Sequence, residues 1–207
     1  MKTNTEFMNI RSLSITIALM FIAIGVNAQS TASYTDSRDG KSYKTVKIGK
    51  QVWMAENLRY KFSESTICAS IESYGCYYSS EEALKACPSG WHLPSDAEWT
   101  KLTNFLGGEK VAGGKMKETG ITNWQDPNTG ATNESGFTAL PAGQKGDRKY
   151  GSGFGQEGDW WSSTKCHDYD GCYFIRFVYY EDNNVERSSK HSGVSCCKIS
   201  VRCLKDN

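Results

Sequence analysis

The stretch CPSGWHLPSDAEWTKL, residues 87–102, decides how this chain folds. Its thiol, imidazole and two carboxylates could form either a catalytic cluster or the start of a helix. Ser95 and Glu98 have the spacing of a capping box, in which each side chain accepts a hydrogen bond from the other residue's backbone amide. Asp96 and Glu98 are two positions apart, so on a helix their side chains point in different directions. The stretch therefore predicts a helix start, not an acid–base pair.

Apolar spacing supports this helix and a second one before it. Trp99, Leu102 and Leu106 recur at helical intervals, and two glycines end the run. Upstream, Ser79 and Glu82 repeat the capping-box spacing. The sequence thus predicts two short helices, one that begins at Ser79 and runs into Cys87, and one that begins at Ser95.

The remaining segments read as strands, turns and one long loop. Residues 39–58 alternate apolar and polar residues around a Gly-Lys turn, as in a hairpin. Residues 158–166, 172–189 and 198–204 have the pattern of antiparallel strands. A Gly-rich region from 107 to 155 has no helical or strand pattern, and a loop of that length is usually functional or cross-braced. We expect an α+β fold with two short helices, antiparallel strands and a long Gly-rich loop region.

Residues 1–28 have the composition of a secretory signal. Lys2 and Arg11 precede the apolar core ITIALMFIAIGV, and Val26-Asn27-Ala28 fits a signal-peptidase site; Met8 is an alternative start. The core is shorter than the roughly 20 apolar residues that span a bilayer. We expect cleavage after Ala28, no transmembrane anchor, and export to the periplasm, the cell surface or the exterior.

The charge of the chain argues against one class of partner. Loss of Lys2, Arg11 and Glu6 with the signal removes the formal net charge of +1. Proteins that bind nucleic acid usually carry a basic patch, and the mature chain has no run of Lys and Arg. We therefore expect no nucleic-acid partner. The length fits a short linker at residues 29–35 and a single domain at 36–207.

All eight cysteines follow the signal, and an even number in an exported chain predicts disulfides. Pairing does not follow from the sequence alone. We favour a bridge from Cys87 to Cys203, which ties the middle of the chain to its end. We also favour a short loop closed by Cys68 and Cys76.

The other four cysteines have two open pairings. Cys166 and Cys172 flank a hairpin-like turn, and they pair either with each other or with the vicinal Cys196 and Cys197. Zinc is the competing interpretation, but the chain has no C-x-x-C pair and its histidines are scattered. We expect disulfides and no metal site.

Six segments resemble a known family: DGKSYKTVKIGKQVWMAENL, ACPSGWHLPSDAEWTKL, VAGGKMKETG, NTGATNESGFTALPAG, WWSST and SVRCL. In this order they are similar to the Fibrobacter succinogenes major paralogous domain, found in exported proteins of Bacteroidetes and Fibrobacteres. The resemblance implies a C-type-lectin-like superfold, in which a Cys87–Cys203 bridge would join the first helix to the last strand. It implies no established activity, and the extra cysteines depart from the simpler family pattern.

Motifs that carry known chemistry are missing from the sequence. The superfold's calcium-dependent sugar site is usually marked by Glu-Pro-Asn or Gln-Pro-Asp followed by Trp-Asn-Asp, and none of these occurs. The segment GGEKVAGGKM lacks the phosphate-loop spacing, and GSGFG is not a nucleophile elbow. We therefore expect no cofactor.

Two functions remain. The favoured one is an exported, non-catalytic binding module whose ligand is a glycan or a protein. If DWWSST is a strand, its two adjacent indoles point to opposite faces, so one of them enters the core. The other indole has two possible environments. It either lies under loop residues such as Phe137 or Phe154, or it stays open as a stacking platform. In the open case the loop from 143 to 159 and the outward indole form the site. The expected ligand-binding residues are Gln156, Glu157, Asp159, Trp160 and Trp161.

The alternative is a thiol-dependent or formylglycine-type oxidoreductase-like enzyme. It would use Cys196 and Cys197, while an acid-dependent enzyme would use acidic loop residues. Those residues are Glu157, Asp159, Asp168 and Asp170, of which the last two are also a weak calcium hypothesis. Asp is common in such turns because its side chain forms hydrogen bonds with the nearby backbone. This structural role explains the acidic residues without catalysis and therefore favours the binding module.

Overall fold

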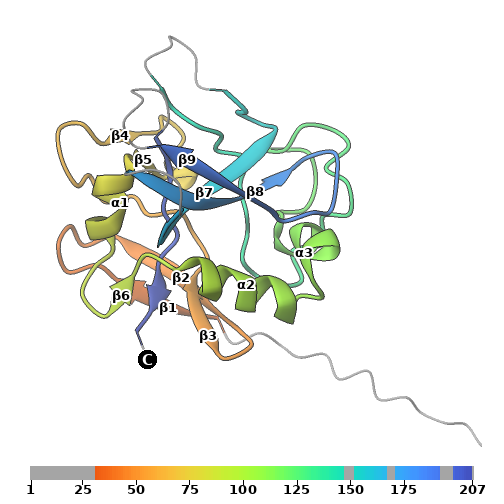
Figure 1. The fold of residues 1–207 in the computed structure, drawn as a ribbon, viewed down its shortest axis with the longest axis horizontal. Helices are drawn as coiled ribbons and strands as arrows, with labels where there is room; N and C mark the ends of the chain where they lie inside the picture. The colour runs from red at the N-terminus through yellow and green to blue at the C-terminus, as the bar shows by residue number, and fades with distance from the viewer. Residues whose placement is uncertain (1–30, 147–151, 167–170, 192–197, 207) are drawn as a thin grey trace, which may run out of the picture.

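The computed structural model describes residues 31–146, 152–166, 171–191 and 198–206. Within these residues the chain has an α+β fold with two β-sheets and three α-helices, which confirms the expected class. In the view of Figure 1 one sheet lies at the bottom of the molecule and the other at the top, with the helices around them.

The lower sheet has five strands and contains the C-terminal strand. Their order across the sheet is β1 (Thr31–Thr35), β2 (Ser42–Ile48), β3 (Gln51–Met54), β11 (Leu204–Lys205) and β6 (Trp91–His92). All neighbours are antiparallel, and the predicted hairpin is β2–β3. Residues 31–35, expected to be part of a linker, instead form β1. The apolar and polar residues of the TASYT segment alternate too weakly to predict a strand. Its backbone groups nevertheless pair with β2 along its whole length.

The upper sheet has six strands and includes the strands expected downstream. Their order is β4 (Ile67–Cys68), β5 (Cys76–Tyr78), β10 (Ile199–Ser200), β7 (Glu157–Lys165), β8 (Cys172–Tyr179) and β9 (Glu186–His191). The β10–β7 pair is parallel, and the other pairs are antiparallel. The C-terminal segment therefore contributes β10 to the upper sheet and β11 to the lower one, and so joins the two.

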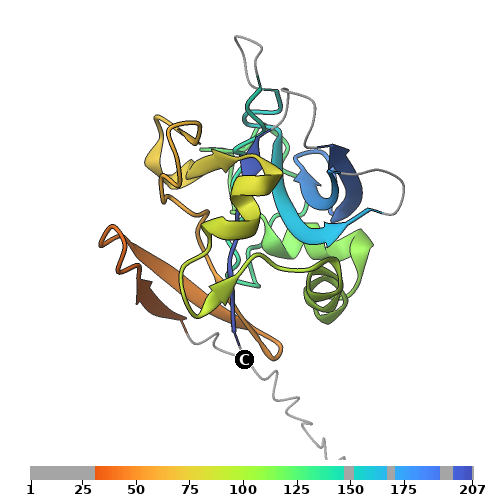
Figure 2. The same ribbon diagram turned by 60° about the vertical axis from the view of Figure 1, so that its left-hand side comes forward.

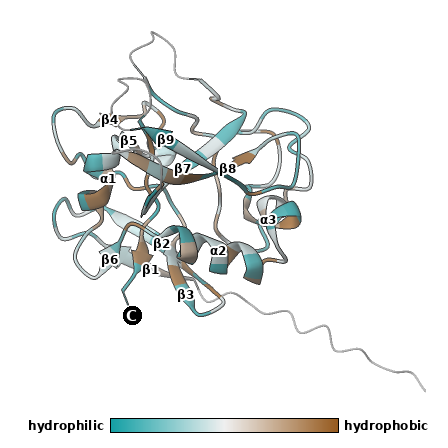
Figure 3. Cartoon of the chain, viewed as in Figure 1, coloured by the Kyte–Doolittle hydropathy of each residue, from teal (hydrophilic) through white to brown (hydrophobic). Residues whose placement is uncertain are grey.

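Both predicted helices begin at confirmed capping boxes. In α1 (Ser80–Ala86) and α2 (Asp96–Phe105), the cap serine accepts from the glutamate amide, and the glutamate carboxylate accepts from the serine amide. The latter bonds are 2.9 Å long for Ser79 to Glu82 and 2.8 Å for Ser95 to Glu98. Figure 3 shows apolar and polar residues side by side on these helices, as expected for helices that pack one face on a core. The carboxylates of the opening stretch are therefore part of the fold.

A third helix, α3 (Glu109–Met116), lies in the region expected to be loop. Its paired glycines have poor helix propensity, which is why the sequence did not indicate it. They are required by packing, because a Cβ on Gly113 would lie 2.1 Å from the carbonyl oxygen of Asn184. The helix therefore forms where it can pack directly on the backbone after β8.

A buried lysine braces the long region that contains α3. The Nζ atom of Lys117 donates to the backbone carbonyls of Thr129, Tyr179 and Asp182 at 2.7 to 2.9 Å. Burial lowers the pKa of Lys117 to about 8, although Asp182 opposes this effect. Three well-placed acceptors keep this cation inside the protein, and they tie α3 to the end of β8. The region from 107 to 155 is thus the cross-braced kind of long loop.

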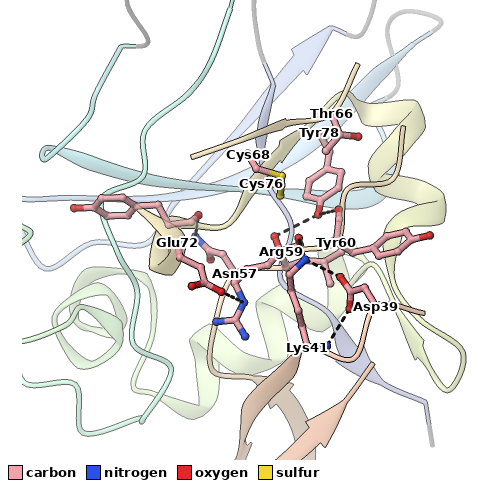
Figure 4. The surroundings of a disulfide bond; sticks show 12 residues. Asp39, Lys41, Asn57, Arg59, Tyr60, Thr66, Cys68, Glu72, Cys76 and Tyr78 are labelled. Carbon is pink, nitrogen blue, oxygen red and sulfur yellow. Dashed lines mark hydrogen bonds and ion pairs between the residues drawn. A yellow bond between two sulfur atoms is a disulfide. The ribbon is translucent and has the colours of Figure 1, made fainter. Parts of the chain in front are cut away.

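Three disulfides lie among the described residues. They are Cys68–Cys76, Cys87–Cys203 and Cys166–Cys172. The two favoured bridges are confirmed, and of the two open pairings for Cys166 and Cys172 the structure has the one between them. Cys196 and Cys197 lie outside the described residues. Figure 4 shows the Cys68–Cys76 bridge beside Tyr78, whose hydroxyl donates to the carbonyl of Tyr60 at 2.6 Å.

Candidate functional site

The two adjacent tryptophans of β7 are both fully buried. The indole of Trp160 donates to Asn57 Oδ1 at 2.9 Å and packs edge-on against Phe137 with ring centres 5.5 Å apart. The indole of Trp161 donates to the carbonyl of Tyr78 at 2.8 Å on the other face of the strand. The open stacking platform is therefore wrong, because both faces of β7 are covered by core at this point.

The remaining residues of the expected site separate into two groups. Gln156 donates from Nε2 to Gln125 Oε1 at 2.9 Å and is not among the residues that line the cavity of Glu157 and Asp159. Phe154 packs on Tyr74 and is 55% exposed, so it covers neither tryptophan. Glu157 and Asp159 do come together. They line one wall of a cavity of about 190 Å³, which we call the polar cavity.

The polar cavity lies on one face of the β7–β8–β9 part of the upper sheet. The register of the strands places Asp159 opposite Phe177, and Ile175 opposite Ser188, so alternate residues of three strands share this face. The two carboxylates stand on one side, an apolar floor lies between, and hydroxyl and ammonium groups stand on the other. The lining residues are Gln144, Glu157, Asp159, Ile175, Phe177, Ser188, Ser189 and Lys190.

A chain of hydrogen bonds crosses the cavity. Lys190 Nζ donates to Gln144 Oε1 at 2.7 Å, and Gln144 Nε2 donates to Glu157 Oε1 at 2.9 Å. Gly153, at a φ of +75°, gives Glu157 its space, because a Cβ there would lie 2.3 Å from the Glu157 side chain. One wall of the site thus depends on a residue without a side chain.

Asp159 is the unusual group of the cavity. Its side chain is 2% exposed, and its Oδ2 atom has no hydrogen-bond partner among the described residues. The pKa of Asp159 is raised to about 7, mainly by burial and also by the nearby Glu157 carboxylate, whereas Lys190 opposes the rise. A buried carboxyl oxygen without a donor is unfavourable unless something else bonds it. Asp159 therefore places a carboxyl group with unused hydrogen-bonding capacity at the wall of the cavity.

The polar groups of the opening stretch have structural partners instead. His92 lies between two carboxylates, with Nδ1 2.6 Å from Asp206 Oδ1 and Nε2 3.2 Å from Glu98 Oε1. Asp96 pairs with Arg176 at 2.6 Å and with Arg187 at 3.0 Å. Burial would raise the pKa of Asp96, but these two guanidinium groups lower it overall. These contacts tie α2 to β8, β9 and the C-terminus, in agreement with the structural interpretation of the stretch.

The sequence did not single out the two residues whose side chains bond across the polar cavity, Lys190 and Gln144. Lys190 lies one position beyond the expected end of the strand at residue 189, because that strand was predicted to end two residues before β9 does. Gln144 lies in the loop from 143 to 159 that was expected to form the site, but no pattern marks it individually. Among the described residues there is no group of three His, Cys, Asp or Glu side chains that could hold a metal. Asp168 and Asp170 lie outside those residues.

Comparison with known proteins gives one match. The model of a family described as the Fibrobacter succinogenes major domain matches residues 46–205. No curated protein and no solved structure matches the chain. In the part of the chain that the structure describes, no helix combines the length and the apolar character that a bilayer-spanning segment requires.

Proposed function

The chain belongs to the Fibrobacter succinogenes major domain family, and we propose that it is an exported, non-catalytic binding module whose polar cavity holds the terminal sugar of a glycan. The observation that carries the proposal is Asp159, which lines this cavity and whose buried Oδ2 atom has no hydrogen-bond partner among the described residues. Disulfides are typical of exported proteins, and three of them support the export that the expected signal at residues 1–28 implies. A C-type-lectin-like superfold remains part of this proposal, supported by the Cys87–Cys203 bridge from the end of α1 to the last strands.

The chemistry of the cavity suits a polyhydroxyl ligand. Glu157 and Asp159 accept hydrogen bonds, Lys190 donates them, and Ser188 can do either. Phe177 offers an apolar surface between these groups, on which the carbon face of a sugar ring can lie. Pockets for drug-sized ligands usually have about 300–1,000 Å³. The volume of about 190 Å³ therefore suits a single ring at the end of a chain.

The enzyme alternative depends on different residues. A thiol-dependent reaction would need Cys196 and Cys197, because the other six cysteines are bridged. Titration of free thiols in the native protein separates the two functions, since a value of zero removes the redox enzyme. Turnover of a bound glycan would contradict the non-catalytic proposal, and it would direct attention to Glu157 and Asp159 as an acid–base pair.

A glycan array followed by calorimetry tests the proposed site. Glu157→Gln and Lys190→Met are each expected to weaken glycan binding about tenfold or more, since hydrogen bonds to charged groups contribute roughly 1.5–3 kcal/mol. Lys165→Met is the matched control, because Lys165 is exposed on the same sheet but does not line the cavity. An array without any binder, or a bound glycan that both cavity variants hold as tightly as the unmodified protein, would contradict the proposal.

The raised pKa of Asp159 gives a second prediction, on stability. A group with a raised pKa contributes stability at low pH, and that contribution is lost as pH rises from 3.8 to about 7. Asp159→Asn removes this loss, so the variant should gain stability relative to the unmodified protein over that interval and keep the gain above it. Urea unfolding at a series of pH values measures the difference. Glu64→Gln, at a carboxylate 97% exposed, is the control and should show no such trend. A stability difference between Asp159→Asn and the unmodified protein that does not change with pH would contradict the prediction.

A further inference from the structure

A second and larger cavity lies on the lower sheet. The polar cavity lies on the upper sheet, which is at the opposite end of the molecule in Figure 1. It has a volume of about 510 Å³, within the usual range of ligand sites. We call it the aromatic–lysine groove. Its lining residues are Ala32, Ser33, Tyr34, Thr45, Lys47, Val52, Ser89, Gly90, Trp91 and Lys205.

The register of the lower sheet builds the groove. Tyr34 lies opposite Tyr43, and Ala32 opposite Thr45, so the face that buries Tyr43 in the core continues outward as the floor of the groove. The turn before β6 forms the facing wall. In Figure 2 the strands of this sheet lie at the outer side of the molecule, with β1 at the margin.

One wall of the groove is aromatic. The rings of Tyr34 and Trp91 have centres 5.2 Å apart and planes inclined at 55°. Trp91 is only 7% exposed, so the half-buried Tyr34 supplies most of the accessible aromatic surface. Thr45 and Ser89 also line the groove and carry hydroxyl groups. This combination provides a stacking surface with hydrogen-bonding groups at its rim.

The charge of the groove is positive. Lys47 on β2 and Lys205 on β11 both line it and are both exposed, and no carboxylate lines it. Neither lysine's ammonium group has an ion pair or a hydrogen bond within the described residues. The nearest acidic residue in sequence, Asp206, is bonded to His92 at 2.6 Å. Two unpaired ammonium groups at one cavity favour an anionic ligand.

We propose that the aromatic–lysine groove binds an acidic saccharide, with a sugar ring on Tyr34 and its carboxylate between Lys47 and Lys205. An acidic peptide shares the charge of such a ligand, but the hydroxyl-lined rim beside a tyrosine ring fits a hydroxylated ring better. The groove shares no lining residue with the polar cavity. The groove is therefore a second site, and its existence does not depend on the proposed function of the first.

The test uses an array of oligosaccharides that contain glucuronic, galacturonic, mannuronic or sialic acid, with calorimetry of the tightest binder at low ionic strength. Lys47→Met/Lys205→Met is expected to weaken that binder about tenfold or more, and carboxyl reduction of the saccharide should do the same. Tyr34→Ala should weaken it by a similar factor. Because these interactions are partly electrostatic and exposed, added salt should weaken binding by the unmodified protein.

Lys61→Met/Lys110→Met removes the same charge from exposed positions elsewhere and should leave binding within about twofold. Glu157→Gln should also leave it unchanged, which separates this groove from the polar cavity. Thermal midpoints verify that each variant is folded. The proposal is overturned if no acidic saccharide binds, if the groove variants bind as well as the controls, or if a polyglutamate peptide binds the groove more tightly than every saccharide.

Discussion

Replacement of Arg202 by methionine should lower the free energy of unfolding by about 3 kcal/mol or more, since each buried acceptor left without a donor costs roughly 1–3 kcal/mol. The guanidinium is completely buried and donates to Asn57 Oδ1 and to the backbone carbonyls of Met54, Phe137 and Thr138. Burial lowers the pKa of Arg202 to about 9, because the charged guanidinium is removed from water. Methionine fills much of the space but satisfies none of these oxygens.

Arg202 also holds together parts of the chain that are far apart in sequence. Its guanidinium lies 4.2 Å from the centre of the Phe137 ring, and it shares Asn57 with the indole of Trp160. Loss of Arg202 therefore weakens the contact between the long loop region, the upper sheet and the segment after β3.

Chemical denaturation of Arg202→Met, Arg202→Lys and Arg187→Met measures this effect. Arg187 is 43% exposed and pairs with Asp96 at the surface, so its loss should cost no more than about 1 kcal/mol. Arg202→Lys keeps the charge but offers fewer donors in another geometry, and its stability should lie between those of the other two variants. Equal stabilities of Arg202→Met and Arg187→Met would contradict the role assigned to the buried network.

Removal of the Cys87–Cys203 bridge should lower the free energy of unfolding by about 2–5 kcal/mol. The two cysteines are 116 residues apart, and the bridge links the end of α1 to the segment between β10 and β11. Closing so long a loop restricts the unfolded chain strongly. Cys87→Ala/Cys203→Ala would release that restriction.

The Cys68–Cys76 bridge is the matched control, because its cysteines are only 8 residues apart. Cys68→Ala/Cys76→Ala should cost roughly 2 kcal/mol less than the long bridge, on the chain-entropy argument. Denaturation of both double variants, with peptide mapping under non-reducing conditions, makes the comparison. A long bridge that is absent from the map, or one that costs no more than the short bridge, would contradict the prediction.

Features that depend on neighbouring residues were predictable from the sequence. The capping boxes at Ser79 and Ser95 were found because a cap is a hydrogen bond between residues three apart. The β2–β3 hairpin was found in the same way, from alternation around a turn. The disulfide between Cys166 and Cys172 stayed open, because the spacing allowed it without excluding the vicinal pair.

The candidate site was only half predictable. Glu157 and Asp159 were marked by their place beside the tryptophans, but Gln144 and Lys190 reach the same cavity from a loop and from the far strand of a three-strand layer. A strand pattern shows that adjacent residues face opposite sides. The pattern does not show whether either face is covered by other parts of the chain. In the folded protein both faces are covered at Trp160 and Trp161.

The sequence by itself therefore determined the class of the fold, its local helix and hairpin starts, and its family. Tertiary structure alone decided that α3 forms despite its glycines, that Lys117 and Arg202 are buried, and that Asp159 is left with an unpartnered oxygen. The physical reason is the range of the interactions. Caps and turns are settled by residues within one turn of each other, whereas burial and the balance of buried charges depend on segments that meet only when the chain is folded.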